Sequence, residues 1–275
     1  MSEKLAIESI PSAPYPSLQP TLVEVPPPPK LRTGALQRWW PTTQSLDLVE
    51  GPAEKVAAAV QTEVGRFLGR EALNGAWKNF ADLDEALASA PDFVNVPTVF
   101  LVLPTRSPWT VLWNNSFLCD GYDSLCWCLT YNHHFRTMHW SAHDEWTSFQ
   151  AGVAYFHRHW DGSKVVQRSV EAGQQDKTWT FYENGEPFPE EDVNGYRERK
   201  KRHRLNEAHM AALLSRLGAS PWQEEFYAVS EAPTFVLTRD GAQAGLLHRS
   251  RDEVFRTHAR APSRTRGRRV SAREL

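Results

Sequence analysis

The sequence predicts an α+β protein, with a single antiparallel sheet of about five to six strands and helices packed on it. Short runs of apolar and β-branched residues follow one another through the middle of the chain, which is typical of consecutive antiparallel strands. Segments with apolar residues at helical spacing lie before and after them. The chain has 275 residues, of which 41% are hydrophobic and 23% charged, as expected of a folded globular protein.

Composition divides the chain into three parts. Residues 1–30 contain eight prolines, four of them consecutive, so this stretch is expected to be an extended, disordered leader. We predict a single α+β domain over 31–229. Residues 230–275 are expected to form an extension that ends in a basic, disordered tail.

Helices are expected at both ends of the predicted domain. Pro52 suits the first turn of a helix, whose apolar stripe is formed by Val56, Val60, Val64 and Phe67. A second short helix is expected over 81–90, with Asp82 as its cap. Later helices are expected from Glu190 or Glu191 through a basic run, and over 205–217, where Gly218 suits the position after the last turn.

Six strands are expected between these helices. Residues 99–103 and 109–113 form a hairpin with a five-residue loop. A helix over about 123–133 follows. The remaining strands are expected near 137–140, 151–159, 165–171 and 178–183, and the Asn184-Gly185 pair predicts a turn.

The segment 114–143 carries the residues for an enzymatic alternative. It combines three thiols, carboxylates and several histidines, so a cysteine nucleophile with a histidine base is one interpretation. The candidate catalytic residues under this alternative are Cys119, Asp120, Cys126, His133 and His134.

A metal-dependent enzyme is a related alternative. His157 and His159 would share one face of a strand and could act as a pair of ligands. Cys126 and Cys128 would point apart on a helix. The chain has no glycine-rich nucleotide motif and no H-E-x-x-H motif, so no cofactor and no bound metal are expected.

The charge distribution suggests a nucleic-acid-associated alternative. The net charge is −2, but residues 249–275 hold nine arginines against three acidic residues, which leaves −8 on residues 1–248. The run at 197–204 is also strongly basic. Both basic segments could contact phosphates, but an acidic body repels nucleic acid. A solvated or salt-bridged helix face is the favoured interpretation of the run, and a solvated, disordered extension that of the tail.

One set of motifs resembles a known group of proteins. It covers about Trp109–Tyr227 and consists of Trp109–Asn115, Asp120–Leu125, Phe156–Arg158, Arg168–Val170, Trp179–Gly185, Glu190 or Glu191, Tyr196–Arg199 and Arg204–Asn206. The pattern is similar to a loose group of bacterial proteins, some of which look like immunity proteins of polymorphic toxin systems. The resemblance implies a protein partner and no catalytic residue.

We therefore predict a non-catalytic, cytoplasmic binding protein that occludes a cognate toxin. No membrane association is expected, because the apolar runs are much shorter than the ~20 residues of a spanning helix. Aromatic side chains dominate protein interfaces, and the sequence contains eleven tryptophans. The partner-binding residues are expected in a loop with exposed Trp140, His143, Asp144, Glu145 and Trp146.

Overall fold

The computed structural model of the protein describes residues 34–39, 43–68, 73–90, 93–116, 123–143, 152–175, 178–239, 248–249 and 253. The proline-rich leader and nearly all of the arginine-rich tail lie outside these residues.

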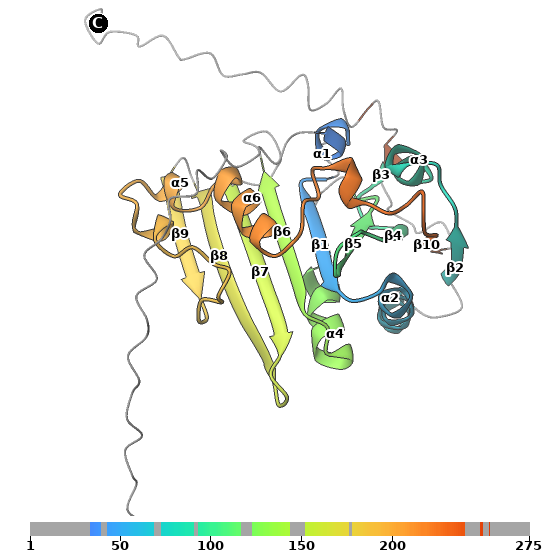
Figure 1. Ribbon diagram of the computed structural model, residues 1–275, viewed down its shortest axis with the longest axis horizontal. Coiled ribbons are helices and arrows are strands. Elements are labelled where there is room, and N and C mark those ends of the chain that lie inside the picture. The colour runs from blue at the N-terminus through green and yellow to red at the C-terminus, as the bar shows by residue number, and fades with distance from the viewer. Residues whose placement is uncertain are drawn as a thin grey trace, which may run out of the picture.

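A nine-stranded antiparallel sheet forms the centre of the molecule, in the order β2-β10-β4-β5-β1-β6-β7-β8-β9 (Figure 1). Figure 1 also shows its twist, since β6 to β9 are seen face-on while β4, β10 and β2 turn nearly edge-on. Its strands are β1 (Ser45–Glu50), β2 (Leu73–Lys78), β4 (Val99–Leu103), β5 (Trp109–Asn114), β6 (Thr137–His143), β7 (Gly152–Trp160), β8 (Val165–Gln175), β9 (Thr178–Asn184) and β10 (Thr234–Arg239). A separate two-stranded sheet pairs β3 (Phe93–Val94) with β11 (His248–Arg249).

The six strands expected from the sequence are all present. The predicted hairpin is β4–β5, in which Leu101 lies opposite Trp113. The predicted turn after β9 is confirmed by Gly185, whose φ is +84°. A side chain at this position would also place its Cβ 2.1 Å from the Gln167 carbonyl oxygen, which is too close. Both the positive φ and the lack of space therefore require glycine.

The predicted number of strands is wrong, because the main sheet has nine. β1 carries Asp47 in its middle, which interrupts the apolar pattern of a buried strand. β2 contains Asn74 and Gly75, both poor strand formers, and lies at an edge of the sheet. β10 was assigned to the extension after residue 229.

Helices cover both faces of the sheet, because alternate residues of each strand point to opposite sides. The helices are α1 (Gly34–Arg38), α2 (Ala53–Leu68), α3 (Leu83–Ala88), α4 (Asp123–His133), α5 (Lys201–Arg204) and α6 (Glu207–Arg216). One core cluster joins α2 and α4 to residues such as Val49 and Val102. The other joins α1, α3 and α6 to residues such as Trp140 and Tyr155.

Two helix ends match the sequence and one helix does not. Asp82 accepts a hydrogen bond from the Glu85 amide and caps α3, and Gly218 follows α6 with a φ of +73°. The helix expected from Glu190 or Glu191 is absent from 190–194. The Glu191 side chain instead turns inward to Arg168 on the sheet, and helical structure begins only with a single 3₁₀ turn at Gly195–Arg197.

The sheet also moves the predicted domain boundary. β10 lies between β2 and β4 and pairs with both, so the body of the protein extends beyond residue 229 to at least Arg239. Within the described residues, no helix combines the length and apolar character needed to cross a membrane.

Candidate functional site

Helix α4 carries the candidate site on its outer side. Its inner side buries Leu125, Cys126 and Leu129 against β1, β6 and β7. Trp127 and Tyr131 are four residues apart, so they share the opposite, solvent-facing side. Their exposed fractions are 43% and 56%, which are high values for large aromatic side chains.

Trp160 and His134 extend this surface. The Trp160 ring packs edge-on against Tyr131 at a centroid distance of 6.2 Å, and stacks on the His134 ring at 4.4 Å. The Arg158 guanidinium carbon lies 5.8 Å from the centre of the Trp127 ring. We call Trp127, Tyr131, His134 and Trp160 the α4 aromatic surface. These contacts order the aromatic rings in advance of any partner.

The end of α4 explains the position of His134. This residue has a φ of +60°, the only positive value outside glycine in the described part of the chain. Its amide donates to the Thr130 carbonyl, and the Phe135 amide donates to Leu129, which closes the helix. His134 was a candidate catalytic base, and the structure places it as a helix-ending residue stacked on Trp160.

A charged pair fixes the start of α4 on the sheet. The buried Arg158 of β7 donates to both Asp123 carboxylate oxygens, at 2.6 and 2.9 Å. Its Nε also donates to Gln167 on β8. Such a two-pronged contact holds the helix in one orientation and keeps the α4 aromatic surface rigid.

Beneath α4, a buried polar cluster links β1 and β6. The His139 Nδ1 donates to Asp47 Oδ1 at 2.7 Å, and its Nε2 lies 3.4 Å from Ser45 Oγ. Burial opposes a charge on His139, but the Asp47 carboxylate outweighs it and raises the pKa of this histidine above its ordinary value. The order Asp47, His139, Ser45 is that of a charge-relay triad.

The cluster lacks an accessible nucleophile. The residue Ser45 is only 7% exposed, and its hydroxyl also donates to the Trp140 carbonyl. Cys126 lies in the same cluster, where burial and Asp47 raise the pKa of its thiol well above the usual value. A thiol with a raised pKa is a poor nucleophile. Cys119 and Asp120, the other members of the cysteine hypothesis, lie outside the described residues.

His133, the second candidate base, belongs to a different contact. Its Nε2 lies 2.7 Å from the buried Glu63 carboxylate of α2, which also accepts from Asn132 and Arg66. This pairing joins α4 to α2. His133 and His134 therefore point to separate partners, and neither is placed beside Cys126.

The two histidines proposed as a metal pair are close together, but one of them is already engaged. The rings of His157 and His159 are 5.7 Å apart on one face of β7. Arg136 donates its Nε–H to His157 Nε2 at 2.7 Å. Because this nitrogen accepts a hydrogen bond, its lone pair is not available to a metal ion. Among the described residues, no group of three or more metal-ligating side chains converges.

The structure contradicts the predicted partner-binding loop at one residue. Most of the other predicted residues lie outside the described part of the chain. Trp140 is 0% exposed and belongs to the core, because its position on β6 faces the helices α3 and α6. His143 ends β6. Its side chain, and all of Asp144, Glu145 and Trp146, lie outside the described residues.

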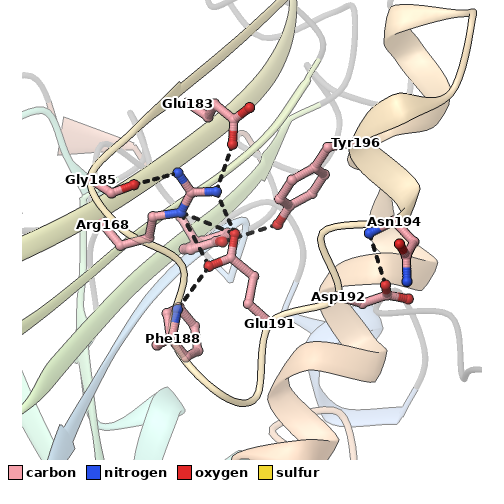
Figure 2. A network of polar contacts seen from close by, with 9 residues as sticks. Arg168, Glu183, Gly185, Phe188, Glu191, Asp192, Asn194 and Tyr196 are labelled. Atoms are coloured by element: carbon pink, nitrogen blue, oxygen red, sulfur yellow. Dashed lines mark hydrogen bonds and ion pairs between the residues drawn. The ribbon is translucent and has the colours of Figure 1, made fainter. Parts of the chain in front are cut away.

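Several motif residues of the family resemblance meet in one buried network (Figure 2). Arg168 of β8 donates to Glu191 and Glu183 and to the Gly185 carbonyl. The Tyr196 hydroxyl is 3.1 Å from that of Tyr155. This network fixes the segment 185–196 to the sheet, so these motif residues have a structural role.

Comparisons of the chain with models of protein families, with curated proteins and with solved structures found no match.

Trp127, Tyr131 and Trp160 were not among the predicted partner-binding residues. The four-residue spacing of Trp127 and Tyr131 was available as a signal, because Leu125 and Leu129 mark the buried side of the same helix. The position of Trp160 beside Tyr131 has no such signal in the sequence, since it depends on how β7 lies beneath α4.

Proposed function

We propose that this protein is a non-catalytic binding protein that captures a protein partner through the α4 aromatic surface. The observation that carries the proposal is the pair Trp127 and Tyr131, which are large, exposed and adjacent. Tryptophan and tyrosine are the residues most enriched among those that dominate binding energy. The contacts with Trp160, His134 and Arg158 reduce the entropy lost when a partner binds.

Charge supports a basic partner. Residues 1–248 carry a net charge of −8, and an acidic body attracts a basic protein and speeds the encounter. A partner of this kind agrees with the resemblance to immunity proteins. We propose that the partner is a cognate toxin, bound in the cytoplasm and neutralised by occlusion.

An enzymatic function has less support. Both described candidate nucleophiles, Ser45 and Cys126, are buried, and the pKa of the Cys126 thiol is raised. The charge-relay order of the buried cluster is accounted for by its packing between β1, β6 and α4.

Co-expression with the product of the neighbouring gene tests the proposal. We expect the wild-type chain to rescue growth of the host and to co-purify with that product. The double variant Trp127→Ala/Tyr131→Ala should bind at least about 100-fold more weakly, since each residue of this kind is worth about 2 kcal/mol or more in an interface.

The chain offers a closely matched control. Trp77→Ala/Tyr182→Ala also removes one tryptophan and one tyrosine, at sites 41% and 58% exposed on β2 and β9. It should retain the wild-type affinity. Equal losses in both double variants, or no complex with the wild-type chain, would contradict the proposal.

A further inference from the structure

A cationic surface remains outside the proposed protein-binding site. Residues 197–204, which we call the basic loop, contain one acidic residue, Glu198. Five of its cations are exposed and form no ion pair with an acid in the described part of the chain: Arg197, Arg199, Lys200, Lys201 and Arg202. These like charges lie close together and repel one another, and an anionic ligand would reduce this electrostatic repulsion.

The basic loop has a defined shape. Before it, Tyr196 is held by its hydroxyl contact with Tyr155. After it, Leu205 is buried in the core. Across it, the Arg204 Nε donates to the Glu198 carbonyl at 2.8 Å. The cations therefore project from a preset scaffold, which lowers the entropic cost of binding.

An aromatic strand lies beside these cations. Helix α5 packs on β9, and the Arg204 guanidinium carbon is 5.3 Å from the centre of the Phe181 ring. Trp179 precedes Phe181 by two residues, so it lies on the same face of β9, and it is partly exposed. A cationic track beside an aromatic ring is how proteins bind single-stranded nucleic acid, with phosphates on the cations and a base on the ring.

An anionic membrane fits the loop less well. Membrane-binding basic segments pair their cations with apolar side chains that enter the bilayer. Residues 197–204 contain no apolar side chain.

We propose that the basic loop and Trp179 form a binding surface for single-stranded nucleic acid. This surface is separate from the α4 aromatic surface, and the inference does not depend on the proposed function.

Fluorescence anisotropy of the full chain with a labelled 12-nucleotide oligouridine tests the charge contribution. We expect the variant Lys200→Ala/Lys201→Ala/Arg202→Ala to bind more weakly. A plot of log affinity against log salt concentration should also become less steep by about 2, because each phosphate contact contributes about 0.7 to this slope and three contacts are lost. The control Lys55→Ala/Lys78→Ala/Lys164→Ala removes three exposed cations elsewhere and should keep the wild-type slope. Both variants retain the arginines of the tail, whose contribution therefore cancels.

Trp179→Ala tests the stacking contribution. It should weaken oligouridine binding by about tenfold and leave the salt slope unchanged, because the ring carries no charge. Tyr182→Ala, on the opposite face of the same strand, should have no effect, and thermal unfolding verifies that each variant is folded. Equal slopes in the two triple variants, or capture by phosphatidylserine vesicles without binding of oligouridine, would overturn the inference.

Discussion

Two buried histidines on neighbouring strands have pKa values shifted in opposite directions, because the charges beside them differ in sign. On β6, the Asp47 carboxylate outweighs burial and raises the pKa of His139. On β7, burial and the nearby Arg136, His159 and Arg158 lower the pKa of His157 to about 3. His157 therefore stays neutral in the folded protein at a pH where the unfolded chain is protonated, and acid favours unfolding at this residue.

We expect the free energy of unfolding to fall by about 2 kcal/mol between pH 6.5 and pH 5 because of His157, at about 1.4 kcal/mol per pH unit. His139 acts in the opposite direction, because a raised pKa contributes stability that is fully present below the pKa of the unfolded chain and is lost as the pH rises through the pKa of the folded protein. This contribution is the same in the wild-type protein and in a variant of His157, so it cancels in their comparison. His157→Gln keeps an acceptor for Arg136 but cannot titrate, so its stability should change less with pH. Urea unfolding of both proteins at pH 7, 6 and 5 measures the difference, and parallel curves would contradict the assignment.

At the scale of elements, one buried arginine holds the segment that follows β9, from Gly185 to Glu191, on the sheet. Arg168 meets the fully buried carboxylate of Glu191 and the 47% exposed carboxylate of Glu183 (Figure 2). The two acids contact the same guanidinium group but differ in solvent access. Removing the buried partner leaves a buried charge without its main counter-charge, whereas water can replace the exposed one.

Glu191→Gln should therefore lower the free energy of unfolding by about 3 kcal/mol. Glu183→Gln removes the same charge from the same arginine and should cost less than about 1 kcal/mol. Urea unfolding at pH 7 gives both values, and limited proteolysis should show earlier cleavage within 186–217 in the Glu191 variant alone. Similar losses in the two variants would show that burial does not decide the strength of this contact.

At the scale of the whole molecule, local patterns predicted the strands that pair with a neighbour along the chain, but not β1, β2 and β10, whose partners lie far away in the sequence. The meander from β6 to β9 was recognisable because each strand pairs with the next one along the chain. β10 has the apolar, β-branched run Thr234–Leu237, which is a strand signal, yet its neighbours β2 and β4 lie more than 130 residues earlier. The spacing of residues along the sequence does not indicate strand pairing over such a distance.

The candidate site also combines features that the local sequence predicts with features that depend on long-range contacts. The outward phase of Trp127 and Tyr131 follows from helical periodicity, so this part of the surface was predictable. The burial of Trp140 and the pairing of Asp47 with His139 depend on strand register and on which face each helix covers. Asp47 and His139 are 92 positions apart, so the sequence carries no local signal of their contact.

The place of β10 between β2 and β4 predicts how the chain responds to shortening. A chain that ends at Val229, the boundary suggested by composition, loses the strand that joins β2 to β4 and leaves Phe100 and Val102 paired only with β5, without their partners on β10. We expect this chain to lack cooperative thermal unfolding and to be sensitive to proteolysis, because both exposed strand edges and apolar core are left uncovered. A chain that ends after Glu253 keeps β10 and β11 and should unfold cooperatively, close to the full-length temperature. Circular dichroism with heating separates the two outcomes, and a cooperative transition in the chain ending at Val229 would show that the sheet is complete without β10.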